Sequence, residues 1–318
     1  MKKDSIQHIL EKTVEIILTL FIVTILSFLL MRLSPVDPAT AYVKRNTPIV
    51  TEEQIQEARI ELGLDKPLIL QYFMWTKNAL HLDFGISLKN GQPVVKEIQK
   101  VLPVTLTVVL LSACIMTIGI LILGSIYYFL RNSIANYFLT FFCIAGISIP
   151  PFYLASVYID IFAVRLGIMS VVGNVGLMRY LPASLCLSIV GIALYSQLLG
   201  KSIEWEMNED YVFYARCRGL KESRILIFHA LPHAVGALLP SFLQMLGLFM
   251  AGAAVVESVF SLPGLGHLII DSVIHRDSPM IHAGVLVLAL SVVLFNIMAD
   301  VLQGFLRKHR KGMEVDAA

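Results

Sequence analysis

The tripeptide Gly200-Lys201-Ser202 has the residue types that end a phosphate-binding loop. Such a loop also needs a glycine at position 195 and a preceding β-strand. Position 195 is Tyr195, and the tripeptide ends a long apolar run. We find no Ser/His/Asp grouping, H-E-x-x-H pattern or pair of carboxylates in a suitable context either. The sequence therefore predicts a protein that is not an enzyme and holds no cofactor of its own.

Three histidines near the C-terminal end could bind a transition metal. His267, His275 and His282 follow one another with Met280 close by, and imidazole suits nickel, copper and zinc. Their spacing is irregular and no fourth ligand closes a set. Ordinary hydrogen bonding in a loop is the alternative interpretation, and both remain open at this point.

Composition places the chain in a membrane. It has 318 residues, of which 57% are hydrophobic and 15% charged, whereas soluble domains carry about 25% charged residues. Six apolar runs approach or exceed the ~20 residues that cross a bilayer core; they cover 14–31, 101–130, 133–159, 181–200, 225–256 and 280–305. The net charge of +2 gives no indication of nucleic-acid binding. We therefore expect an all-α integral membrane protein with six transmembrane helices.

The basic residues predict how these spans are oriented. Six spans put both termini on one side, together with the polar segment 201–231, and Lys2, Lys3 and the tail from Arg307 to Lys311 are strongly basic. Because positive residues favour the cytoplasm, we expect both termini there. A cleavable signal peptide is the rival, with Ala39-Thr40-Ala41 as its small-residue pattern, but the first apolar run is too long for one.

We divide the chain into three parts on this basis. Residues 1–33 form the N-terminal tail and first span, 34–100 a long extracytoplasmic loop, and 101–318 a five-helix transmembrane core. Within the loop, Thr51 and Gln54 fit a capping box, and Pro67 precedes a second helical stretch. Its aromatic residues could dock a partner or lie at the membrane interface, as Trp and Tyr often do.

The polar segment 201–231 predicts a helix, a glycine turn and a second helix. Asn208 is a candidate N-cap, and Gly219 stands where a left-handed residue would end the first helix. The charge order also suits the helix dipole, with Glu209 and Asp210 in the first turn and Arg216 and Arg218 in the last. An ordinary cytoplasmic loop is the alternative.

Two further features are candidates for a translocation path. Pro150-Pro151 interrupts the third apolar run and must kink or break its helix; broken helices at membrane depth are tolerated where they line a cavity or are buried in protein. Glu257 ends the fifth run, and an ionisable residue there marks a functional candidate. Capping or pairing at the membrane interface would explain Glu257 equally well.

These motifs together resemble a known family of transport proteins. Residues 209–212, 215–216, 218–220 and 229–232 resemble the EAA loop of the dipeptide, oligopeptide and nickel permeases, which are membrane subunits of binding-protein-dependent ABC importers. Further similarities lie at 33–38, 62–67, 83–85, 257–266, 276–279, 296 and 300. Cys217 and His233 depart from the family pattern, where small residues and asparagine are common.

The resemblance implies a type I ABC importer permease fold in a bacterial inner membrane. In that family the loop docks on the ATPase, which points to Glu209, Asp210, Ala215, Arg216, Gly219 and Leu220 as coupling residues. It implies as partners a second homologous permease, two ATPase subunits that bind ATP and magnesium, an extracytoplasmic binding protein and membrane lipid. Residues 79–87 look most like nickel permeases, so nickel or a metal chelate is the first expected cargo and a peptide the alternative. The rival function is that of a self-sufficient secondary transporter, which would need midspan ionisable residues or paired broken helices. The sequence has a single such break, at Pro150-Pro151.

Overall fold

The computed structural model describes residues 2–32, 37, 39–40, 42–43, 50–168 and 176–316, with side chains for those between 12–29, 37–43, 50–168 and 176–306. Apart from Asp37, the motif at 33–38 lies outside the described residues, as do Ala41 and the side chains of Lys2, Lys3 and the basic tail. Within the described part the elements are helices. One isolated β-bridge pairs Ile86 with Pro93.

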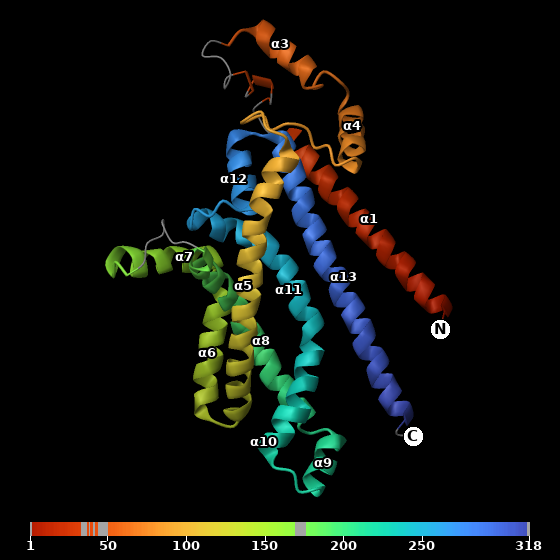
Figure 1. Ribbon diagram of the computed structural model, residues 1–318, viewed down its shortest axis with the longest axis vertical. Coiled ribbons are helices and arrows are strands. Elements are labelled where there is room, and N and C mark those ends of the chain that lie inside the picture. Colours follow the sequence, from red (N-terminus) through yellow and green to blue (C-terminus); the bar gives the residue numbers. More distant parts are fainter. Residues whose placement is uncertain are drawn as a thin grey trace. The chain divides into compact units, whose positions relative to one another are not determined.

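The predicted spans are present as helices. Five are long and apolar enough to cross a membrane: α1 (Lys2–Arg32), α5 (Val94–Phe129), α8 (Leu181–Glu206), α11 (Leu231–Val259) and α13 (Ser278–Asp316). A sixth candidate is a bent pair, in which α6 (Ile134–Ser148) is followed by α7 (Pro151–Tyr158) and η1 (Ile159–Arg165) with a bend of 97°. Such a pair is either one broken span or a re-entrant segment. Figure 1 shows the bend at the end of α6. The predicted break at Pro150-Pro151 is confirmed, and the described elements agree with the all-α fold expected from the sequence.

The helices pack into two compact units, which are described separately. The first comprises Met1–Thr105 and Pro263–Val293, and the second comprises Leu106–Leu262 and Leu294–Ala318. These units cut across the three parts expected from the sequence, because α5 and α13 each contribute to both. The three-part division concerns sides of the membrane, so it stays a prediction.

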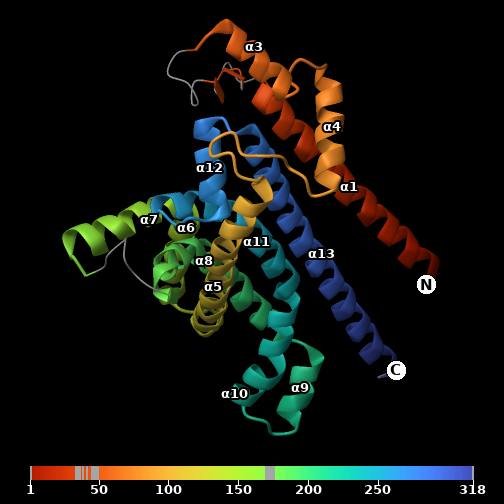
Figure 2. The ribbon, with the colours of Figure 1, turned by 45° about the horizontal axis from the view of Figure 1, so that its top comes forward.

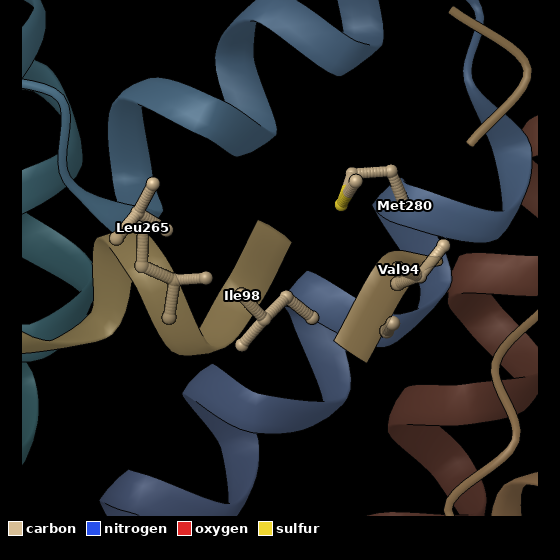
Figure 3. Packing of buried hydrophobic residues seen from close by; sticks show 6 residues of the cluster. Val94, Ile98, Leu265 and Met280 are labelled. Atoms are coloured by element: carbon tan, nitrogen blue, oxygen red, sulfur yellow. The ribbon is translucent and has the colours of Figure 1, made fainter. Parts of the chain in front are cut away.

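The first unit has a core where three segments distant in sequence meet. Val94 and Ile98 of α5 pack with Leu265 of α12 (Leu265–His275) and Met280 of α13 (Figure 3). The α12–α13 corner is then fixed to the segment before α5 by Asp277. Its carboxylate accepts hydrogen bonds from the Ser87 hydroxyl and from the amides of Leu88 and Lys89, at 3.1 and 3.3 Å for the two amides.

Two shorter helices, α3 (Glu52–Glu61) and α4 (Leu68–Leu80), complete the first unit. The predicted capping box is confirmed, because the Gln54 amide donates to Thr51 Oγ1 at 3.3 Å and the Thr51 amide donates to Gln54 Oε1 at 3.2 Å. The Arg59 side chain also reaches Asp37 at 3.0 Å. These contacts fix the start of α3 and link α3 to Asp37.

In the second unit, α5 and α8 approach closely at glycines. A Cβ added at Gly124 would lie 2.8 Å from the Leu199 Cβ, and one at Gly200 would lie 2.6 Å from the Tyr127 ring. Small residues allow this kind of close packing between helices in a membrane. The α5–α6 hairpin is tied by a hydrogen bond of 3.3 Å from Thr140 to the Tyr127 hydroxyl.

Candidate functional site: the loop between α8 and α11

The segment from α8 to α11 folds as a short helix, a tight turn and a second helical stretch. α9 (Asp210–Cys217) is followed by α10 (Glu222–Ile225) and η3 (Leu226–Ala230), which lead into α11. Figure 2 shows α9 and α10 together at one end of α11. The predicted helix, turn and helix are therefore present.

The predicted N-cap of the first helix is wrong. Glu209 occupies that position, with no side-chain hydrogen bond to the helix, while Asn208 Nδ2 donates to the Glu204 carbonyl at 2.8 Å. Asn208 thus satisfies the end of α8 instead of the start of α9, because the free carbonyls of the preceding helix lie within its reach. Glu209 and Asp210 remain exposed at the N-terminal end of α9, where negative charge suits the helix dipole.

Four of the predicted coupling residues form one structural motif at the end of α9. The Gly219 amide donates to the Arg216 carbonyl at 2.9 Å, and the Leu220 amide donates to the Ala215 carbonyl at 3.2 Å. With Gly219 at φ +74°, this is the Schellman termination of a helix. The left-handed conformation predicted for Gly219 is confirmed.

A bidentate ion pair between Arg216 and Glu222 spans this turn. Arg216 Nε donates to Glu222 Oε1 at 2.6 Å, and Nη2 donates to Oε2 at 3.2 Å. The hydrogen bond from Arg216 lowers the pKa of Glu222, and the same bond raises the pKa of Arg216. The carboxylate is therefore charged at neutral pH, and the pair links α9 to α10. The sequence pattern did not reveal Glu222 as the partner of Arg216.

Three side chains anchor α9 to the ends of the long helices. The Tyr211 hydroxyl donates to Oε2 of the buried Glu206 at the end of α8, at 2.9 Å. The ring of His233 in α11 lies 5.4 Å from the Tyr211 ring. Neither Tyr211 nor Glu206 was predicted as a functional residue. An acidic residue at the end of an apolar run, with a tyrosine five residues later, could have indicated this hydrogen bond between α8 and α9. His233, noted as a departure from the family pattern, takes part in the anchor.

The two faces of α9 differ sharply. Val212 and Ala215 are buried, whereas Phe213 and Tyr214 are largely exposed. Trp205 in the last turn of α8 is largely exposed as well. Large aromatic side chains left exposed in this way are typical of a surface that another protein covers.

The candidate path residues lie at α7 and α11 of the second unit. Pro150 precedes α7 and Pro151 is its first residue. At the far end of α7, the Tyr158 ring lies 6.0 Å from the ring of Phe260, which directly follows α11. Glu257, in the last turn of α11, is fully buried. α7 and the end of α11 thus meet at Tyr158, at the opposite end of α7 from the two prolines.

The three histidines are not brought into a ligand set. His267 and His275 both lie on α12, two turns apart and so separated by about 12 Å along the axis. His275 contacts Asp271, with Nδ1 3.2 Å from Oδ1, and His282 is stacked on Phe28 with Nδ1 2.9 Å from Ser27 Oγ. The described residues contain no group of three or more potential metal ligands.

An apolar cavity of about 70 Å³ lies among α5, α8 and α11, lined in part by Thr117, Tyr195 and Phe242. Cavities that hold drug-sized ligands measure roughly 300–1,000 Å³. This cavity is therefore too small to identify a cargo site within the second unit.

Comparison with known proteins identifies the family. The model described as binding-protein-dependent transport system inner membrane component matches residues 117–312. The chain belongs to this family. The model for the N-terminal part of such membrane components matches residues 5–109, so the binding-protein-dependent transport family accounts for nearly the whole sequence. The protein is accordingly the inner-membrane permease of an ABC importer.

Relatives in the binding-protein-dependent transport family carry names that refer to peptides. A putative peptide transport system permease of Brucella suis is 33% identical over 304 residues, covering 92% of this chain and 95% of the relative. The glutathione transport system permease GsiC of Escherichia coli is 33% identical over 297 residues, covering 93% and 96%. Neither name refers to nickel.

Proposed function

We propose that this permease forms half of the translocation path of an ATP-driven importer and is moved through the loop 201–231. The observation that carries the proposal is the construction of α9. It is anchored to α8 by Tyr211 and Glu206, ends in a fixed Schellman turn, and exposes Phe213 and Tyr214. A helix held this rigidly transmits a displacement to the spans that it joins.

In the proposed mechanism, ATP and magnesium bind to two partner ATPases, and closure of these subunits displaces α9. The Tyr211–Glu206 hydrogen bond passes the displacement to α8, and the Arg216–Glu222 pair passes it through α10 towards α11. Movement of α8 and α11 would then reposition the region that holds Glu257 and the α6–α7 break. Access would switch from the outside to the inside of the membrane.

We infer that the cargo is a short peptide or a peptide-like thiol such as glutathione. The support comes from the names of the Brucella suis and Escherichia coli relatives, each aligned over more than nine-tenths of this chain. The expectation of nickel, based on residues 79–87, finds no support in these relatives. The separated positions of His267, His275 and His282 give no support to a metal site in the described residues either.

The proposal carries the remaining expectations with it. A second, homologous permease would complete the path, and an extracytoplasmic binding protein would deliver the cargo. Both termini and α9 would lie in the cytoplasm, with 34–100 outside and the five-helix core within 101–318. Pro150, Pro151 and Glu257 would belong to the path.

Native Cys217 allows a direct test of the coupling contact. It is exposed in the last residue of α9. With Cys114, Cys143 and Cys186 replaced by serine or alanine, a thiol-reactive photocrosslinker on Cys217 in the purified four-subunit complex should attach to an ATPase subunit. As the control, the crosslinker on Ile60→Cys with Cys217 also replaced should not. Failure of Cys217 to crosslink in an active complex would contradict the coupling role.

The cargo is tested separately in proteoliposomes that contain the complex and its binding protein. We expect ATP-dependent uptake of radiolabelled dipeptide or glutathione, and no uptake of radioactive nickel above vesicles without ATP. Nickel uptake without peptide uptake would overturn the cargo inference while leaving the coupling proposal intact.

A further inference from the structure

One side of α4 packs against α1 and α13 through aromatic side chains. The Tyr72 hydroxyl lies 2.8 Å from Thr24 Oγ1 in α1. The Tyr72 ring lies 6.4 Å from Phe21 and 5.7 Å from Phe28, both in α1. Trp75, one turn further along, contributes a ring 5.6 Å from His282. These contacts fix which side of α4 faces the protein.

Another side of α4 is apolar and exposed to solvent in the isolated chain. Ile69, Phe73 and Leu80 are 74%, 64% and 80% exposed, and their spacing of four and seven residues places them on one helix face. No residue of α4 is buried, and no charged residue occurs between Lys66 and Lys77. An apolar face of this size is normally covered by another protein or by lipid.

The contacts with α1 give the depth at which α4 lies. α1 is a candidate span, and its first charged residue after Glu15 is Arg32. Thr24 precedes Arg32 by two turns, which corresponds to about 12 Å of helix. The core of one leaflet is only about 15 Å thick. Tyr72 therefore meets α1 below the surface of the leaflet that the C-terminal half of α1 crosses.

We propose that α4 is an interfacial helix whose face of Ile69, Phe73 and Leu80 is covered by the acyl chains of that leaflet. Its 13 residues span about 20 Å and cannot cross a ~30 Å core. Lys66 and Lys77 flank its apolar stretch, and the Lys66 side chain lies along α4 with Nζ 3.6 Å from Met74 Sδ, so that its stem covers apolar surface. α4 thus anchors the loop after α1 to the membrane, in addition to α1 itself. α3, with the acidic residues Glu52 and Glu53 in its first turn, lies in water.

Tryptophan fluorescence tests this placement. The chain has two tryptophans, Trp75 and Trp205. Trp75 is replaced with phenylalanine and Trp205 is kept, and the signal of Phe73→Trp on α4 is taken as the difference from the same complex without that substitution. Ile60→Trp on the exposed side of α3 is the matched control. The complete importer is reconstituted in nanodiscs of phosphatidylcholine with or without bromine on the acyl chains, and iodide serves as the aqueous quencher, with ATP-dependent uptake verifying each variant.

We expect brominated lipid to quench position 73 and to leave position 60 unchanged, with emission from position 73 shifted to shorter wavelength. Iodide should give the reverse order. Quenching of position 73 by iodide to the extent seen at position 60 would overturn the proposal. Protection of position 73 from both quenchers would also overturn it, because a protein would then cover the face. Leu80→Trp repeats the measurement if Phe73→Trp impairs assembly.

Discussion

The turn at Gly219 gives the sharpest test of how the loop works. Its φ of +74° lies in the left-handed region, and a Cβ added there would meet nothing within 4 Å. Substitution therefore changes backbone strain without creating a clash. Alanine should cost about 1–2 kcal/mol, asparagine less because it is enriched in this region, and valine more because β-branched residues are rare there.

A change of 1–2 kcal/mol alters the population of the intact turn by roughly 5–30-fold. Uptake and ATP hydrolysis are measured in the same proteoliposomes. We expect the uptake per ATP hydrolysed to fall in the order Gly219→Asn, Gly219→Ala, Gly219→Val. Gly219→Pro should abolish uptake, because proline fixes φ near −65°. Gly304→Ala in α13, where a Cβ also meets nothing within 4 Å, should leave uptake unchanged.

Two results would refute this reasoning. Equal uptake per ATP for wild type and Gly219→Val would show that the turn does not carry the coupling. If all of the Gly219 variants lost uptake because they failed to insert into the membrane, Gly219 would be needed for biogenesis instead of coupling. Immunodetection of the permease in membranes separates this case from uncoupling.

Three other changes have expected outcomes. Tyr211→Phe removes the donor to buried Glu206 and should weaken the anchor by about 1–3 kcal/mol, so that ATP hydrolysis exceeds uptake. Tyr137→Phe on the exposed side of α6 should behave as wild type. Asp277→Asn removes a buried charge that accepts several hydrogen bonds and should lower stability by about 1–3 kcal/mol, measured as a reduced melting temperature in detergent. Gly124→Ala places a Cβ 2.8 Å from the neighbouring helix and should cost about 1–3 kcal/mol in the same assay; an unchanged melting temperature in either variant would contradict the packing described.

Local chemistry in the sequence accounts for what was predictable. Uninterrupted apolar runs gave the spans, Pro150-Pro151 gave the broken helix, and Gly219 gave the left-handed turn. Each of these signals depends on residues within a few positions of one another. The apolar runs did not give the helix ends, since α5 begins at Val94 and α13 continues to Asp316, through polar residues that favour helix as well as loop.

Contacts between separate elements were beyond sequence reasoning. Asn208 fits the N-cap of α9 by type, but its side chain bonds to α8, because two helix ends compete for one amide. Glu222 completes the ion pair with Arg216 only after the Gly219 turn folds back. The cargo is also beyond such reasoning: residues 79–87 favour nickel, whereas the names of the relatives refer to peptides and glutathione.

The bond between Ser87 and Asp277 joins residues 190 positions apart. During synthesis, the segment at 87–89 therefore emerges long before the carboxylate that completes it exists. The first unit can close only when the ribosome has made almost the entire polypeptide. A permease truncated before its last span would leave that segment unsatisfied, a defect that membrane proteases could recognise before an incomplete importer assembles.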